Sequence, residues 1–340
     1  NPLPTNTYSA PKVMKYAGGE LAFSLQSTND ALQHLGEFNY RPELEVAPTI
    51  GYTLFTNKAN SVAGFGYGAS SSYPFAKALF NDDMIARQMT DFDAVSASNL
   101  AQLGYQFSYG AVLAPSLRVA ASYSATPAAT PMTPNAPQNM QVKVGAAYQI
   151  NQRLTGGLTY SNVNERSALL GAAYDSNSIL SLGQNSTDIL GLSLAFRLTR
   201  DSSLLFNGEL GSTEAGNGGT SSLFAATSRI QSQAFGVTYM QQNLWKNNDQ
   251  LVASIKQPLR VSSGSAAILS AHVDEQGYAV YDKSWSSLTP DGREINLTLS
   301  YRVPTRKTDT LAVQALYQKD ALNISGYDSA QLGVIWNAAF

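Results

Sequence analysis

The feature that most constrains the fold is a regular alternation of apolar with small or polar residues, which recurs in segments from about residue 96 to the end of the chain. In the stretch LRVAASYS (117–124), one face carries Leu117, Val119, Ala121 and Tyr123, and the other face is small or polar. A period of two residues is typical of β-strands that bury one face, whereas an amphipathic helix repeats at 3.6 residues. The sequence therefore predicts an all-β architecture.

The connections between these segments alternate in length. Short turns such as INQR, LTRDSS and VPTRKTD alternate with long polar stretches such as TPAATPMTPNAPQN, GSTEAGNGGTSSLFAATSR and YQKDALNISGYDSA. Short turns at one end and long loops at the other are typical of outer-membrane barrels. We therefore expect a closed, antiparallel transmembrane β-barrel of about twelve strands in the outer membrane of a Gram-negative bacterium.

The main structural alternative is a soluble β-sandwich, whose strands also alternate. Charged residues make up only 14% of the chain, against roughly 25% in typical soluble domains. The polar faces carry mostly Gly, Ser, Thr, Asn and Gln rather than the Lys, Glu and Asp of a solvated sheet. The membrane barrel is therefore the favoured interpretation, with outer-membrane lipids as its surroundings.

The last ten residues, QLGVIWNAAF, form another alternating segment that ends in an aromatic residue. Its apolar face includes Trp336 and Phe340. We expect this to be the closing strand, with Phe340 and Trp336 as the signal that the outer-membrane β-barrel assembly machinery recognises.

Residues 1–95 have a different pattern, so we divide the chain into a pre-barrel segment (1–95) and a barrel (96–340). A helix is predicted near 74–90, because Pro74 suits a first turn and Leu79, Ile85 and Met89 are spaced for one face. This helix could plug the pore. Alternatively, the short apolar stretches before it belong to the barrel, which would then have about fourteen strands. The start of the chain has no signal-peptide pattern, so we expect a mature product or a piece of a longer protein.

Several charged residues fall on the polar strand faces, where a lipid-facing orientation would cost ~2–4 kcal/mol at mid-depth. We expect them to point inward, where they would either line a hydrated pore and grip a plug or fill a narrow lumen. The candidates are Arg118, Lys143, Arg197, Glu209, Lys256, Arg260, Arg293, Glu294 and Arg302.

Catalytic and metal chemistry find little support in the sequence. The chain has no cysteine and two histidines, and we expect neither a metal site nor a cofactor. Ser221 in GGTSSLFA superficially matches a subtilase nucleophile turn, but a serine nucleophile needs a histidine base and an orienting carboxylate. The pair Asn81–Asp82 could be a self-cleavage point, although a helix cap is the favoured interpretation. A net charge of −2 gives no reason to expect nucleic acid as a partner. We therefore expect no enzymatic activity.

Three stretches together resemble a known family. SIKQPLRVSSGSAAI (254–268) and LTPDGREINLTLSY (288–301) resemble consecutive motifs in the translocator barrels of subtilisin-like autotransporters. NDDMIARQM (81–89) resembles the segment that precedes that barrel, with Asp83 and Arg87 in its two charged positions. The resemblance implies the C-terminal β-domain of a type V secretion protein, which carries its own N-terminal passenger to the cell surface.

The alternative function is an outer-membrane porin or small-molecule channel. A porin usually has about sixteen strands and an open lumen. Strand number and the presence of a plug should therefore separate the two functions.

Overall fold

The computed structural model describes most of the chain from residue 52 onward and a few short strands before it. The described residues are 7–8, 12–16, 19–23, 26–27, 52–57, 61–67, 72–101, 104–126, 138–166, 168–173, 183–216, 224–273, 276–305 and 310–337.

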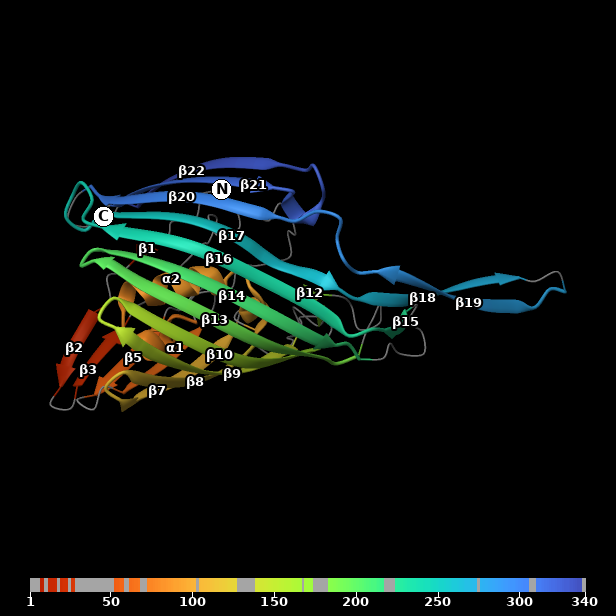
Figure 1. Cartoon of the computed structure of the whole chain (residues 1–340), viewed down its shortest axis with the longest axis horizontal. Coiled ribbons are helices and arrows are strands. Elements are labelled where there is room, and N and C mark those ends of the chain that lie inside the picture. The colour runs from red at the N-terminus through yellow and green to blue at the C-terminus, as the bar shows by residue number, and fades with distance from the viewer. Residues whose placement is uncertain are drawn as a thin grey trace.

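The fold is built on one large antiparallel sheet in which sequence neighbours pair (Figure 1). Twelve successive strands form its main part: β6 (Val62–Tyr67), β7 (Tyr105–Ala114), β8 (Leu117–Ala125), β9 (Gln138–Asn151), β10 (Leu154–Arg166), β13 (Asn185–Thr199), β14 (Ser202–Glu214), β16 (Ile230–Gln242), β17 (Gln250–Ser263), β20 (Ile295–Pro304), β21 (Thr310–Lys319) and β22 (Ser329–Asn337). Three further strands extend it beyond β6: β2 (Lys12–Tyr16), β3 (Gly19–Phe23) and β5 (Tyr52–Asn57). The predicted all-β class is confirmed. Within the described residues, the pairings run from β2 to β22 and include none that joins these two ends.

Smaller sheets complete the strand content. Two are two-stranded, formed by β1 (Thr7–Tyr8) with β4 (Gln26–Ser27) and by β11 (Ala168–Leu169) with β12 (Ala172–Ala173). The third contains β15 (Phe224–Thr227), β18 (Ser265–Val273) and β19 (Ala279–Ser287), and it projects well beyond the main sheet (Figure 1).

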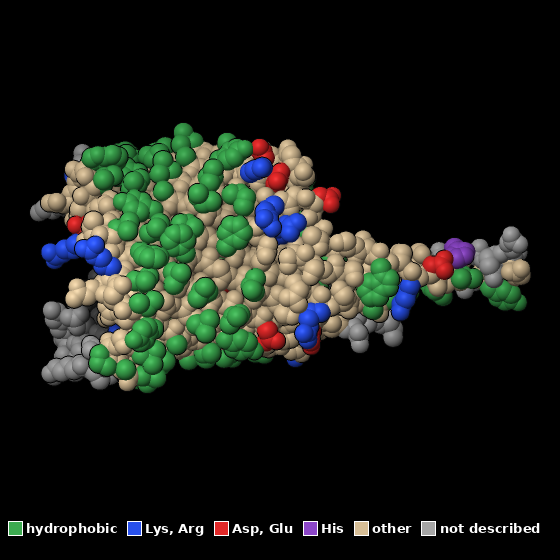
Figure 2. Space-filling view, in the orientation of Figure 1, with side chains coloured by type: hydrophobic (Ala, Val, Ile, Leu, Met, Phe, Trp, Pro, Cys, Tyr) green, Lys and Arg blue, Asp and Glu red, His purple; other side chains and the backbone are tan. Residues whose placement is uncertain are grey.

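The outer face of the main sheet is apolar over its middle. The alternation predicted from the sequence places large side chains such as Leu192 (56% exposed), Leu210 and Leu299 (53% exposed) on this face. Figure 2 shows hydrophobic side chains as a band across this face of the sheet, with charged side chains gathered beyond its two edges. We call this surface the apolar belt. Polar residues such as Ser193 and Ser254 are buried on the opposite face.

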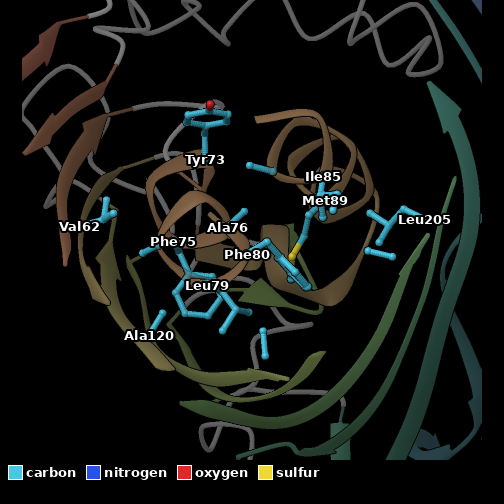
Figure 3. Packing of buried hydrophobic residues seen from close by; sticks show 14 residues of the cluster. Val62, Tyr73, Phe75, Ala76, Leu79, Phe80, Ile85, Met89, Ala120 and Leu205 are labelled. Carbon is cyan, nitrogen blue, oxygen red and sulfur yellow. The ribbon is translucent and has the colours of Figure 1, made fainter. Parts of the chain in front are cut away.

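Two helices, α1 (Tyr73–Phe80) and α2 (Asp83–Asp93), lie in the hollow of the curved sheet (Figures 1 and 3). The predicted helix over 74–90 is thus two helices. Asn81 ends α1 in the left-handed conformation (φ 55°), and the Asp82 side chain caps α2 by accepting hydrogen bonds from the backbone N–H groups of Met84 (2.9 Å) and Ile85 (3.1 Å). Asn81–Asp82 is therefore a pair of helix caps. Among the described residues, no helix is both long and apolar enough to cross a membrane.

The helices are inserted between two strands that pair directly with each other. β6 pairs with β7 from Val62↔Gly110 to Tyr67↔Tyr105, and α1, α2 and the 3₁₀ turn η1 (Ala97–Ala101) occupy the connection between them. The sheet therefore continues across the expected boundary at residues 95 and 96, and a strand that precedes the helices is part of it.

The two ends of the sheet differ, and the strand directions fix which parts of the chain lie at each. We call the end with the short turns at 115–116, 152–153 and 200–201 the turn end, and the opposite end the loop end. Successive antiparallel pairings place the start of β2 at the loop end and the last residues of β22 at the turn end. The projecting sheet of β15, β18 and β19 also lies at the loop end (Figure 1).

One connection at the turn end, the 243–249 turn between β16 and β17, is organised by a single carboxylate. Asp249 accepts hydrogen bonds from the backbone N–H groups of Leu244 (2.7 Å), Trp245 (2.9 Å) and Lys246 (2.9 Å). It also accepts one from the Tyr301 hydroxyl on β20 (2.7 Å). Burial alone would raise the pKa of Asp249, but these four donors outweigh it and hold the pKa at about 2.

This pKa predicts how the turn responds to acid. A carboxylate whose pKa is lower in the folded state than its unfolded value of ~3.9 stabilises the fold above that value, and loses this contribution as the pH falls toward the folded value. Asp249→Asn should therefore lower the unfolding midpoint by its full amount from about pH 5 upward, and the difference from the wild type should shrink as the pH falls toward 2. Unfolding curves of both proteins across this range test it, and a difference that stays constant with pH would contradict it.

Candidate functional site

The candidate site is the interface between the two helices and the inner face of the sheet, which we call the helix–wall interface. Its apolar part consists of α1 side chains packed onto glycines of the sheet. An added Cβ at Gly157 would lie 2.8 Å from the Phe80 ring, and one at Gly145 would lie 3.2 Å from both Leu79 and Phe75. The absence of side chains at these two glycines therefore leaves room for Phe75, Leu79 and Phe80, which pack together in the apolar cluster (Figure 3).

This fit predicts a large effect of a bulky residue at the glycine. Gly157→Leu should displace Phe80 and destabilise the protein by about 1–3 kcal/mol, the usual cost of overpacking. Gly208→Leu is the matched control, because nothing lies within 4 Å of a Cβ added there. Urea unfolding in detergent measures both variants, and an equal loss of stability in the two would contradict the docking of Phe80 against Gly157.

The polar part of the interface pairs helix carboxylates with cations on three different strands. Arg197 on β13 donates to the Asp82 carboxylate at 2.5 Å, Lys256 on β17 pairs with Asp91, and Lys143 on β9 pairs with Asp93 at 3.3 Å. Each pair joins residues at least fifty positions apart in the chain. The helices are thus held by opposite charges at both ends of α2.

The pair of Lys143 and Asp93 belongs to a larger buried cluster. The Lys143 ammonium donates to the Ser98 hydroxyl at 3.0 Å, and that hydroxyl donates to the Glu209 carboxylate at 2.6 Å. The exposed fractions are 0% for Asp93 and Ser98, 4% for Lys143 and 5% for Glu209. The one ammonium of this cluster therefore pairs with Asp93 directly and is linked to Glu209 through the Ser98 hydroxyl, away from solvent, so the lysine is the group on which the cluster depends.

Neutral hydrogen bonds to strand backbone add specificity. The side-chain amide of Gln88, which is fully buried, donates to the Thr238 carbonyl at 2.8 Å and to the Ser203 carbonyl at 3.3 Å. The Ser203 hydroxyl donates back to the Gln88 side chain at 2.9 Å. Beyond α2, the Leu259 N–H on β17 donates to the Val95 carbonyl at 2.8 Å. These contacts fix the position of the segment along the strands as well as its distance from them.

Most of the inward charges expected from the sequence do lie on the inner face. Arg197, Lys256 and Glu209 contact the helical segment directly. Glu294 is buried outside the helix–wall interface, where it accepts hydrogen bonds from Gln318 and from the Leu322 N–H in η2 (Ala321–Asn323). Arg302 is half-buried and lies on the same face of β20 as the buried Asn296.

Arg260 does not follow the expected pattern. The pairing of β16 with β17 shifts between Gln233↔Arg260 and Phe235↔Gln257, so the alternation is broken at Gln257–Pro258. After this bulge Leu259 packs inward, against the cluster around Ala97. The Arg260 guanidinium instead donates to the carbonyl groups of Pro290 (2.8 Å) and Gly292 (2.9 Å). Its expected place in the lumen is therefore wrong, and it holds the segment that leads into β20.

Arg293 also differs from the expectation of an inward side chain. Arg293 and Glu294 are adjacent, and consecutive residues of extended chain point to opposite sides. Glu294 is buried and Arg293 is exposed, so only the carboxylate lies on the inner side.

The remaining predicted residues have separate surroundings. Asp83 lies on the helices and pairs with Lys77 at 2.8 Å and with the Tyr73 hydroxyl at 2.8 Å, and Arg87 is exposed one turn further along α2. Trp336 is exposed on the outer face of β22. Phe340 and Ser221 lie outside the described residues.

The interface has the features of a docking surface. Among the described residues, no group of three or more His, Cys, Asp or Glu side chains could hold a metal ion. Most of the participating side chains are buried, with Asp91 exposed at the edge, and their chemistry accounts for a helical segment held in the hollow of the sheet. No protein-family model matches the chain, and a comparison with curated proteins finds no match.

Proposed function

We propose that this chain is an outer-membrane translocator domain, a closed transmembrane barrel that carries its own N-terminal passenger to the cell surface. The observation that supports the membrane location best is the apolar belt. Large apolar side chains point away from the sheet while serines, carboxylates and lysines are buried on its inner face. This inverts the arrangement of a water-soluble protein and matches a sheet whose outer surface faces lipid.

Closure of the sheet is part of the proposal. In hydrocarbon an unpaired strand edge leaves backbone N–H and C=O groups without partners, at several kcal/mol for each group. A sheet of this size that already curves around two helices would therefore pair its edges in the bilayer. The outer-membrane β-barrel assembly machinery would be the partner that inserts it.

Two features support translocation in particular. The first is the resemblance of 254–268 and 288–301 to the barrels of subtilisin-like autotransporters. The second is the direction in which the chain runs through the sheet, because β2 begins at the loop end and β22 finishes at the turn end. A passenger joined before β2 would then leave on the side of the long loops, which in outer-membrane barrels is the cell exterior.

A small-molecule channel is the second candidate, and the connection between β6 and β7 favours it. Tyr67 and Tyr105, which flank the helical segment, pair with each other at the loop end. The helices are therefore an inward-folded loop tethered on both sides, a geometry that would also suit a loop that narrows a channel.

The test is display of a passenger. An epitope-tagged domain fused upstream of Asn1 should become accessible to protease added to intact Gram-negative cells. The control lacks residues 329–340, which should prevent barrel assembly and abolish surface exposure. A folded, membrane-inserted barrel whose tagged domain stays protected would favour the channel over the translocator.

A further inference from the structure

The 243–249 turn at the turn end presents an unusual surface. Trp245 is 75% exposed and Leu244 is 38% exposed, although the backbone around both is fixed by Asp249. A large indole that an ordered turn leaves three-quarters exposed gains little burial from the fold. The sequence of the turn, NLWKNND, places a lysine directly after the tryptophan.

The tryptophan ring is joined to the outer face of the sheet. Its centroid lies 5.0 Å from that of Tyr301, with the rings at 72°, an edge-to-face contact. Tyr301 follows Leu297 and Leu299 along the same face of β20, so Trp245 continues the apolar belt past the end of the strands. Lys246 donates to the Pro304 carbonyl at 2.7 Å, which uses one of its three donors.

We infer that this turn is a membrane-interface anchor, in which Leu244 and Trp245 enter the boundary between headgroups and acyl chains and Lys246 meets the phospholipid phosphates. This inference rests on the proposed membrane location. An amphipathic indole is enriched at that boundary, and a lysine can bury its stem while its ammonium reaches water or phosphate. The partner of this turn is a phospholipid leaflet. The turn is continuous with the apolar belt, and Lys246, the one cation in its sequence, lies beyond the end of the belt.

Asp249 is the positioning residue of this anchor. It bonds the N–H groups of both Trp245 and Lys246 and the hydroxyl of the tyrosine against which the indole packs. Removing its charge would leave the side chains present but would loosen the turn that aims them.

The three tryptophans of the chain allow a direct test, since Trp285 lies on the projecting β19 and Trp336 on β22. A protein that keeps only Trp245 (Trp285→Phe, Trp336→Phe) is reconstituted in phosphatidylcholine vesicles that carry bromine near the headgroup or near the chain end. Shallow bromine should quench Trp245 ~2-fold more than deep bromine. Adding Asp249→Asn should remove this preference, while Tyr301→Phe, which removes one of the four bonds, should retain most of it.

Two reporters separate the failure of this inference from the failure of the membrane location. With all three tryptophans replaced by Phe, Leu299→Trp should be quenched most by deep bromine, and a Trp285-only protein should respond only to an aqueous quencher. If Leu299→Trp behaves so but Trp245 responds only to the aqueous quencher, the anchor is wrong and the membrane location stands. If bromine quenches none of the reporters in a folded protein, both are wrong.

Discussion

Deleting residues 74–90 should raise the single-channel conductance of the reconstituted protein several-fold and lower its thermal stability. These residues form α1 and most of α2, whose side chains fill the hollow of the sheet. Without them the proposed barrel would hold water where Phe75, Leu79 and Phe80 now pack. The stability should fall because Arg197 and the wall glycines would lose their helix contacts. Planar-bilayer recordings and heat-modifiability on gels measure the two effects.

The intact chain provides the comparison for this deletion. A translocator closed by its own helices predicts a small conductance in the intact protein. A wide, steady conductance in the intact protein that the deletion leaves unchanged would contradict the helices as a plug and would favour an open porin.

Replacing Lys143 by methionine should destabilise the protein by about 3–5 kcal/mol, because it leaves Asp93 buried without its cation and removes the ammonium that is linked to the buried Glu209 through Ser98. Methionine keeps much of the packing of the lysine stem, so the loss reports mainly on charge. Lys283→Met is the control, since Lys283 is exposed on the projecting β19. Urea unfolding in detergent measures all variants.

A second substitution identifies the cause of that loss. Asp93→Asn in the Lys143→Met background removes one of the two stranded carboxylates and should recover part of the stability. If the loss in free energy of unfolding of the double variant equals the sum of the losses of the two single variants, Lys143 and Asp93 contribute independently and the buried cluster is not a unit.

The face on which each strand residue lies could be predicted from the sequence because successive side chains of a strand point to opposite sides of the sheet. The inward face predicted for Lys256 agrees with the structure because β17 and β20 stay in register over this stretch, from Gln250↔Arg302 to Lys256↔Asn296. Period-two reasoning fails for Arg260 because the bulge at Gln257–Pro258 shifts the pairing by one position, and a one-residue shift reverses every later side chain.

The helix–wall interface could be predicted only in part. The wall cations Arg197 and Lys256 could be predicted because both lie on the polar faces of alternating strands. Their partners Asp82 and Asp91 lie on a helix, where an acidic residue is ordinarily a cap or a solvated side chain. Only the three-dimensional placement of the helices between β6 and β7 brings these pairs together. The break at Asn81–Asp82 had a local signal, because asparagine readily adopts the left-handed conformation and aspartate is a favoured N-cap.

Labelling at position 299 tests whether the apolar belt faces lipid. The chain contains no cysteine, so Leu299→Cys and Tyr281→Cys each introduce a single thiol. In outer membranes, Leu299→Cys should react with a lipid-soluble maleimide and resist a membrane-impermeant one, whereas Tyr281→Cys on the projecting β19 should react with the impermeant reagent. Rapid labelling of Leu299→Cys by the impermeant reagent in a folded, membrane-bound protein would contradict a lipid-facing belt.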